Sequence, residues 1–494
     1  MVKKKKMNQD RLEPSHDPLK IARLPFTEKI GDMVSISIRV GILICLIASI
    51  TLAFHSTFAK PDRWFPLPEH LHVIQNVSVI QIDNEPTNIS HIIFGIAGSS
   101  NTWHSRSNYS KLWWNPNTCR GFAWLDKRPD DFKSDPMIIP YKISKGWMRF
   151  RHVHSASAVR IARIVYESFR LGLPNVRWFV MGDDDTVFFP ENLVTVLGKY
   201  DHNQLYYIGG NSESVEQDLM HCFDMAFGGG GIAISYALAV RLTQIMDSCL
   251  HRYYYFYGSD QRIWACVNEL GVPLTRERGF HQLDIKGNPY GILAAHPLAP
   301  LVSLHHLDQL NSLFPDQSQM NSLGKLISAY HLDPARIVQQ SVCYDHRRKW
   351  SISISWGYTI QIYTTLVIVA DLQMPFQTFK TWRSSSDGPF TFNTRWLNPD
   401  ECQQPSIFFL DQVRMVGTGS VTTYKRYFGK EGKNCKRADG EVKRIKVSVL
   451  KLDSEYWKNV PRRQCCQIMN GGSIKDGNVH IRIRKCRPQE TITI

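Results

Sequence analysis

Residues 178–189 read WFVMGDDDTVFF, and the fold of the chain is best inferred outward from this stretch. Four apolar residues and a glycine lead into three consecutive acids, Asp183, Asp184 and Asp185, after which the chain is apolar again. Short apolar runs are typical of buried parallel strands, and open α/β sheets bind ligands at the carboxyl ends of such strands. The pattern therefore predicts a buried strand in an α/β layer, with the acids at a binding site.

The three acids need a neutralising partner, because crowded carboxylates repel one another and raise one another's pKa. Side chains two positions apart can face the same side, so Asp183 and Asp185 can converge while Asp184 points elsewhere. Hard carboxylate oxygens suit Mg²⁺ or Mn²⁺ shared with substrate phosphates. The triplet thus indicates an acid-metal-diphosphate site. A solvated acidic turn is the alternative from the triplet alone.

Composition and charge narrow the class of protein. The 494 residues suggest more than one domain, and a hydrophobic content of 43% indicates a folded core. The net charge is +15, of which residues 1–39 supply +4 (nine basic, five acidic) and residues 421–494 supply +11 (eighteen basic, seven acidic). Residues 40–420 are therefore balanced. A nucleic-acid enzyme would carry basic residues around its active centre, so no nucleic-acid partner is expected.

The N-terminal segment predicts a membrane anchor. Residues 1–39 are polar and basic, and residues 40–59 carry no formal charge apart from a possible one on His55. A run of this length is just sufficient to span a bilayer. Basic residues before it and few after it favour a cytosolic tail over 1–39, a type II signal anchor over 40–59 and a luminal stem over 60–86. A cleaved signal peptide is the alternative.

Cysteines and glycosylation sequons favour the secretory pathway. One of the eleven cysteines, Cys45, lies in the apolar segment, and the other ten include no CxxC pair that would suggest zinc. Three sequons begin at Asn76, Asn88 and Asn108. Together these features favour an oxidising lumen and disulfide bonds. The pairing cannot be read from the sequence, although the adjacent Cys465 and Cys466 would need separate partners.

Other segments predict the remainder of the layered fold. Residues 91–96, 121–126 and 205–210 read as strands, whereas 153–172 and 190–200 read as helices. Strand, helix and acid-tipped strand in succession indicate a parallel α/β layer. The glycines after the first strand have neither the dinucleotide-binding nor the P-loop spacing, which disfavours ATP chemistry.

Three further motifs carry candidate site residues. Residues 227–231 read FGGGG, which lets the backbone pass close to a bulky group, with a flexible linker as the alternative. Asp260 follows an aromatic run at 253–257 and opens a helix, where an N-cap role is the alternative. Histidines occur within 280–282 and 303–308, and each is either structural or a metal ligand.

The pattern changes beyond Trp350. Residues 350–356 alternate strictly between apolar and polar, and 358–368 and 442–452 are also typical of strands. We therefore expect a separate β-rich module at the C-terminus.

Taken in order, the acid triplet, the FGGGG loop, the Gly-Ser-Asp of 258–260 and the SLHHLD of 303–308 resemble the fringe-like β-1,3-glycosyltransferases. The likeness is closest to the plant branch of fringe-related proteins and covers roughly residues 90–345. It implies a GT-A fold, an α/β domain with a mixed and mostly parallel central sheet, over 87–345. The β-rich module of unknown role would then occupy 346–494.

The resemblance also implies partners and roles. It implies a UDP-sugar donor, a glycan or glycoprotein acceptor, a Mn²⁺ (or Mg²⁺) ion and a Golgi membrane protein with a luminal catalytic domain. The metal would be held by Asp183, Asp185 and His305, and Asp260 would be the catalytic base. The nucleotide sugar would be contacted by Asp183, Asp184, Arg106, Asp126, Gly229 and Gly230. Leu304 replaces an aromatic residue common before this histidine in relatives, so His281 and His306 are alternatives for the metal.

The chemistry of these residue types suits an inverting sugar transfer. One carboxylate can take the proton of an attacking hydroxyl, and a metal can stabilise the charge on a departing diphosphate. A catalytically inactive carbohydrate-binding or scaffold protein is the alternative, although the intact acids count against it. A glycoside hydrolase is a further alternative, but its two acids lie on opposite sides of the glycosidic bond, roughly 5–10 Å apart. The acids of the triplet are neighbours in the sequence, which counts against a hydrolase.

Overall fold

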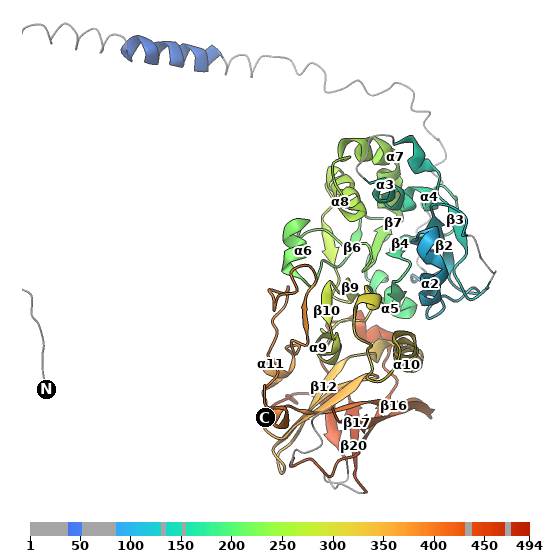
Figure 1. Ribbon diagram of the computed structural model, residues 1–494, viewed down its shortest axis with the longest axis vertical. Coiled ribbons are helices and arrows are strands. Elements are labelled where there is room, and N and C mark those ends of the chain that lie inside the picture. Colours follow the sequence, from blue (N-terminus) through green and yellow to red (C-terminus); the bar gives the residue numbers. More distant parts are fainter. Residues whose placement is uncertain (1–37, 52–84, 130–134, 151–154, 430–436, 470–475) are drawn as a thin grey trace, which may run out of the picture. The chain divides into compact units, whose positions relative to one another are not determined.

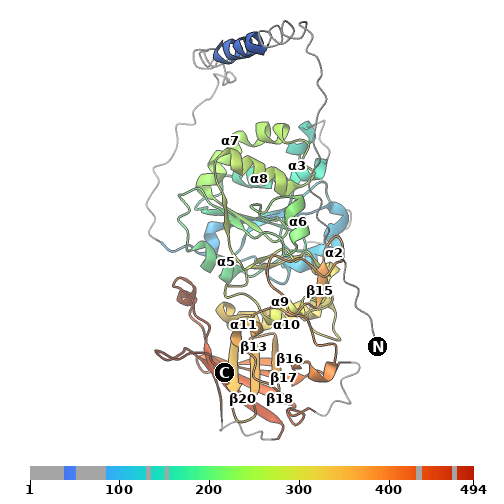
Figure 2. The ribbon, with the colours of Figure 1, turned by 90° about the vertical axis from the view of Figure 1, so that its left-hand side faces the viewer.

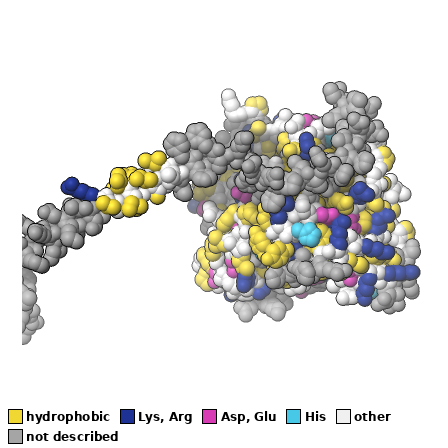
Figure 3. Space-filling model, turned by 90° about the horizontal axis from the view of Figure 1, so that it is seen from above, with side chains coloured by type: hydrophobic (Ala, Val, Ile, Leu, Met, Phe, Trp, Pro, Cys, Tyr) yellow, Lys and Arg dark blue, Asp and Glu magenta, His cyan; other side chains and the backbone are white. Residues whose placement is uncertain are grey.

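The computed structural model describes residues 38–51, 85–129, 135–150, 155–429, 437–469 and 476–494. The chain divides into two compact units, Met1–Asp83 and Asn84–Ile494. In the first unit a helix covers residues 38–51, and its apolar side chains are exposed (yellow in Figure 3). Among the residues that the structure describes, no helix is both long and apolar enough to cross a membrane. The predicted anchor over 40–59 is therefore unsupported. Most of the predicted tail and stem lies outside the described residues.

A seven-stranded sheet lies at the centre of the first half of the second unit (Figure 1), in the order β3-β2-β1-β4-β7-β6-β8. Neighbouring strands run parallel except β7, which is antiparallel to both β4 and β6. The strands are β1 (Ile92–Ala97), β2 (Arg120–Leu125), β3 (Tyr141–Ile143), β4 (Trp178–Asp183), β6 (Tyr207–Gly209), β7 (Ile232–Ser235) and β8 (Leu274–Arg276). The predicted fold class, a mixed and mostly parallel α/β layer, is confirmed.

Strand β4 is buried on both faces, as its continuous apolar sequence predicts. Trp178 and Val180 belong to one core cluster, and Phe179 and Met181 belong to the other. This division follows from the strand geometry, because successive side chains point to opposite faces of a sheet. The second cluster is covered by α3 (Ala156–Ala162), α4 (Ile164–Phe169), α7 (Tyr236–Arg252) and α8 (Ser259–Glu269), and the first by α2 (Ser100–Ser110), α5 (Pro190–Leu197), α9 (Tyr290–Ala294) and α10 (Gln319–Leu332).

The single helix predicted over 153–172 is two helices, α3 and α4, which meet at Arg163. The hydrogen bonding continues through the junction, because the N–H of Arg163 donates to Val159 O and the N–H of Glu167 donates to Arg163 O. The Arg163 guanidinium is buried and pairs with Asp247 of α7. The difference from the prediction is therefore a local kink in one amphipathic segment.

Beyond the sheet the chain forms a closed barrel in the order β12-β13-β14-β16-β17-β18-β20-β19 (Figure 2), which confirms the predicted β-rich C-terminal region. Its strands are β12 (Gln340–Asp345), β13 (Trp350–Ser355), β14 (Thr359–Tyr363), β16 (Ser406–Val416), β17 (Gly419–Arg426), β18 (Arg444–Leu450), β19 (Cys465–Ile468) and β20 (Asn478–Arg484). One core cluster contains both Val180 of β4 and Ile352 of β13, so the sheet and the barrel share a continuous hydrophobic core.

Disulfide bonds are present in both parts, as the cysteine content predicts. Cys249 of α7 pairs with Cys266 of α8. In the barrel, Cys466 pairs with Cys343 and Cys465 pairs with Cys486, so the two adjacent cysteines have separate partners.

Candidate active site

The acid triplet lies at the carboxyl end of β4, where the chain turns sharply. The N–H of Thr186 donates to Asp183 O at 3.0 Å, and the N–H of Asp183 donates to the Thr186 hydroxyl oxygen at 2.8 Å. The same hydroxyl donates to Gly229 O at 2.7 Å. This turn therefore fixes the directions of the three carboxylates and ties them to the glycine loop.

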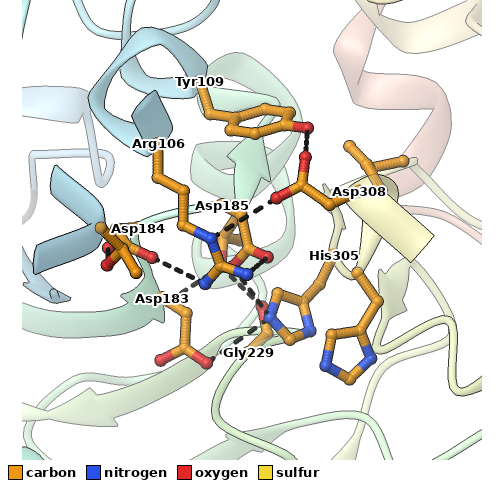
Figure 4. A network of polar contacts seen from close by, with 12 residues as sticks. Arg106, Tyr109, Asp183, Asp184, Asp185, Gly229, His305 and Asp308 are labelled. Carbon is orange, nitrogen blue, oxygen red and sulfur yellow. Dashed lines mark hydrogen bonds and ion pairs between the residues drawn. The ribbon is translucent and has the colours of Figure 1, made fainter. Parts of the chain in front are cut away.

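Asp183 and Asp185 converge on His305, as Figure 4 shows. His305 Nε2 lies 3.1 Å from Asp185 Oδ1 and 3.5 Å from Asp183 Oδ2. Each of the three residues offers one ligand atom, and these atoms all lie within 4.8 Å of one another. His305 comes from the end of β11 (Ser303–Leu304), which pairs with β5 (Val187–Phe188) directly after the triplet. The structure thus brings together the three residues that the resemblance assigns to a metal.

The donor set fits a divalent cation. Asp185 Oδ1 is buried and makes no well-formed hydrogen bond in the described structure; its polar contact is the approach of His305. Burial acts to raise the pKa of Asp185, but His305 and Arg106 outweigh it and lower the pKa to about 2. Burial acts to lower the pKa of His305, but Asp183 and Asp185 outweigh it and raise the pKa to about 10. The two carboxylates therefore stabilise a positive charge at this place, here the proton on His305. A bound metal ion would take the place of that proton.

Asp184 points away from His305 and binds the first helix of the domain, α2. Its Oδ1 lies 3.1 Å from Arg106 Nη1, and its Oδ2 accepts a hydrogen bond of 3.0 Å from the Thr102 hydroxyl. Burial and the neighbouring Asp185 raise the pKa of Asp184 to about 6. The divergence predicted from the spacing of the three acids is thus present.

Arg106 links the triplet to Asp308. Its Nη2 lies 3.2 Å from Asp185 Oδ2, and its Nε lies 3.4 Å from Asp308 Oδ2. The Tyr109 hydroxyl donates to the other oxygen of Asp308. Sequence reasoning assigned no role to Tyr109 or Asp308, although Asp308 lies three positions after His305 in the same motif. One guanidinium therefore neutralises part of a cluster of acids that would otherwise repel one another.

Asp126 lies at the same edge of the sheet, one residue beyond β2. It accepts hydrogen bonds from the backbone N–H of Ser100 at 2.7 Å and from the Ser100 hydroxyl at 3.3 Å. Burial acts to raise the pKa of Asp126, but these hydrogen bonds outweigh it and lower the pKa. The residue is held ionised beside the start of α2, at the strand ends where a ligand would bind.

The glycine loop joins the acid cluster to Asp260. A Cβ atom on Gly228 would lie 2.6 Å from Asp260 Oδ1, and a Cβ atom on Gly229 would overlap the His305 ring. The N–H of Gly230 donates to Gln282 Oε1 at 2.6 Å. Only residues without a side chain fit here, which supports the prediction of a site loop over that of a linker.

Asp260 lies in the first turn of α8, but the N-cap of this helix is Gly258. The Asp260 carboxylate instead accepts a hydrogen bond from the N–H of Gly228. Burial, followed by the charge of Asp183, raises the pKa of Asp260 to about 6. A carboxylate with a raised pKa, adjacent to the proposed metal site, suits a general base.

The two alternative histidines are engaged elsewhere. His281 lies 3.1 Å from Glu213 Oε1 and 2.9 Å from His296, in a buried group. His306 lies 3.0 Å from Asp284 Oδ1 and stacks on Trp382. Of the three candidates, only His305 contacts the acids of the triplet.

Two family models match the chain. The model described as "Protein of unknown function, DUF604" matches residues 217–466, which is 250 of the 494 residues. The chain belongs to this family. A second model, described as "Fringe-like", matches residues 136–288, and it confirms the resemblance to fringe-like glycosyltransferases. This DUF604 protein is therefore a glycosyltransferase in class, with a sugar donor and an acceptor as its partners.

No curated protein matches the chain. One similar solved structure is that of a glycosyltransferase involved in the glycosylation of the major capsid of PBCV-1, with 11% identity over 47% of this chain and 97% of that chain. Its TM-score is 0.26, and a likeness of this size carries no argument here.

Proposed function

We propose that the protein is a metal-dependent, inverting transferase that moves a hexose or N-acetylhexosamine from a UDP-sugar to a hydroxyl of a glycan, in a β-1,3 linkage. The observation that carries the proposal is the glycine loop, in which Gly228 contacts Asp260 and the next residue contacts His305. A candidate base and a candidate metal site thus lie on either side of one short backbone segment. In an inverting transfer a base can take the proton of the acceptor while a metal stabilises the departing diphosphate.

In the proposed reaction Asp260 receives the proton of the acceptor. The acceptor oxygen forms a bond to the anomeric carbon while its proton moves to the Asp260 carboxylate. The bond from the anomeric carbon to the diphosphate oxygen breaks, and its electron pair leaves with UDP. Attack on the face opposite the departing diphosphate inverts the anomeric configuration.

Asp183, Asp185 and His305 would hold a Mn²⁺ or Mg²⁺ ion, whose positive charge would stabilise the departing diphosphate. Arg106 and the Thr102 hydroxyl hold Asp184 away from this group, and Asp126 is ionised at the same sheet edge. We assign Asp126, Asp184, Arg106, Gly229 and Gly230 to the binding of the nucleotide sugar. Asp126 and Asp184 lie at the same sheet edge as the proposed metal site, Arg106 contacts Asp185, and the two glycines belong to the loop that contacts His305.

A nucleotide-release assay tests the proposal. The purified full-length protein is incubated with a panel of UDP-sugars, beginning with UDP-galactose and UDP-N-acetylglucosamine, with Mn²⁺, with Mg²⁺ or with excess chelator. We expect UDP release from at least one donor that requires the metal. Release that is equal in chelator would refute the metal role, and glycan binding without any turnover would favour an inactive carbohydrate-binding protein.

We further infer that this activity is located in the lumen of the Golgi. The disulfides and the clustered sequons support an oxidising secretory compartment. Fluorescence microscopy of the tagged full-length protein against Golgi markers tests the inference, and a cytosolic signal would contradict it.

A further inference from the structure

A long connection of the barrel lies along the catalytic domain. Residues 364–405, here called the strap, link β14 to β16 and contain α11 (Val369–Leu372) and β15 (Phe379–Thr381). Strand β15 pairs antiparallel with β10 (Ile285–Gly287) of the catalytic half. Figure 1 shows the strap in orange, extending from α11 toward α6 (Val215–Met220). The strap therefore packs against the catalytic half, although in the sequence it connects two strands of the barrel.

Hydrogen bonds fix the strap to the catalytic half. The Ser384 hydroxyl donates to Glu216 Oε2 of α6 at 2.6 Å. Farther along, the N–H of Thr391 donates to Glu213 O at 3.0 Å, and Ser214 forms a β-bridge with Phe390. The residues between β15 and these contacts consequently have a defined position.

Trp382 lies directly after β15 and begins a stack of three rings that ends at the acid cluster. Its ring centroid lies 4.4 Å from that of His306, with an interplanar angle of 4°. The His306 centroid lies 3.9 Å from that of His305. The planes of the two histidine rings are tilted by 32°. His306 has a left-handed backbone (φ 55°), an uncommon conformation for a residue with a side chain.

The His305 ring lacks the usual support of a metal-binding histidine. Such a histidine generally donates its second ring nitrogen to a carboxylate or a carbonyl, which fixes the ring orientation. His305 Nδ1 is buried and has no hydrogen-bond partner in the described part of the chain. At Nε2 the ring faces Asp183 and Asp185, and Gly229 packs against it, so the support that is missing at Nδ1 has to come from the remaining packed neighbour, His306. His306 is itself held by Asp284 at 3.0 Å and by the face of Trp382.

We propose that Trp382 is a positioning residue for the metal site, acting through His306 on His305, so that the barrel module supplies a part of the catalytic centre. This inference rests on the metal site of the proposed function. It gives a role to the C-terminal module, whose role the sequence left open. The extent of the DUF604 match is consistent with it, because residues 217–466 include the glycine loop, His305 and the strap in one family unit.

Metal titration of strap variants tests this inference. Calorimetry measures binding of Mn²⁺ alone, without nucleotide, to the full-length wild type and to Trp382→Phe, Trp382→Leu and Trp382→Ala. Phenylalanine keeps a flat ring, whereas leucine keeps bulk without one. We expect the leucine and alanine variants to bind Mn²⁺ about 10–100-fold more weakly, as for other supporting residues of metal ligands. The phenylalanine variant should retain most of the wild-type affinity.

Trp396 provides the matched control, because it lies in the same strap and the residue is 66% exposed. Trp396→Ala should bind Mn²⁺ like the wild type, and thermal unfolding should confirm that every variant is folded. If Trp382→Leu folds and binds Mn²⁺ as tightly as the wild type, the inference is wrong, even if turnover falls through a higher KM for the donor. If the wild type itself binds no Mn²⁺, the metal site of the proposed function fails first, and this inference fails with it.

Discussion

The open sheet and the closed barrel of this protein use their strands differently. In the sheet, β1, β2 and β4 end at one edge, where Asp126 and the triplet lie at the strand ends. In the barrel, strands such as β18 and β20 alternate between buried and exposed residues, and closure leaves no free edge. We therefore expect the catalytic residues at the strand ends of the open sheet. The barrel contributes to the site through the strap, which connects two of its strands.

The largest expected effect comes from comparing one aspartate in each region. Asp185→Asn removes a candidate metal ligand, and the lost stabilisation of several kcal/mol corresponds to a decrease in kcat/KM on the order of 10³–10⁴-fold. Asp411→Asn changes an exposed acid on barrel strand β16 and should leave turnover unchanged. The UDP-release assay measures both. Equal activity of the two variants would remove the distinction between the regions.

Replacement of the candidate base should separate catalysis from metal binding. Asp260→Asn is expected to lower kcat about 10³-fold, within the usual range for loss of a general base, and to leave Mn²⁺ affinity within a few-fold of the wild type. Because the pKa of Asp260 is raised to about 6, the carboxylate is protonated and inactive below that pH. Turnover of the wild type should therefore rise with pH through about 6. A flat profile between pH 5 and 7 would contradict the assignment.

Alanine substitution of one glycine in the site loop and one in a helix should give a smaller effect on activity. A methyl group on Gly229 would overlap His305, whereas nothing lies within 4 Å of the methyl position on Gly324 of α10. Gly229→Ala should displace the loop or the ring and lower kcat/KM by roughly 10²-fold, the cost of a misplaced catalytic group. Gly324→Ala should keep full activity and stabilise the fold by about 0.5–1 kcal/mol, since alanine favours a helix. Kinetics and urea unfolding measure the two effects.

The disulfides of the two regions should differ in stability rather than in activity. The Cys249–Cys266 bond spans 17 residues and the Cys343–Cys466 bond spans 123. If chain entropy dominates, loss of the first should cost about 3 kcal/mol and loss of the second nearly 5 kcal/mol. Denaturation of the two paired Cys→Ser variants gives the order. If loss of the Cys249–Cys266 bond costs more stability than loss of the Cys343–Cys466 bond, local contacts rather than loop length determine the effect.

The sequence predicts the sheet and its acids more completely than it predicts the surroundings of the site. Strand β4 and the triplet could be inferred locally, because an apolar run followed by acids has a direct structural meaning. The role of His305 came from the resemblance, since a lone histidine carries little information by spacing. The position of Trp382 was not predicted. The three-residue strand before it is too short to show a periodicity. Its place beside His306 depends on the pairing of β15 with β10, in which Ile285 lies opposite Thr381, 96 positions later in the sequence.

The direct succession of Gly228 and Gly229 has a consequence for the evolution of donor preference. One peptide unit separates the contact with Asp260 from the contact with His305, so a shift of this segment changes both distances together. A substitution that enlarges the sugar pocket by moving the loop would also disturb proton acceptance and departure of the nucleotide. Changes in selectivity should therefore arise first from side chains around the loop, such as Gln282, while the glycines themselves stay fixed.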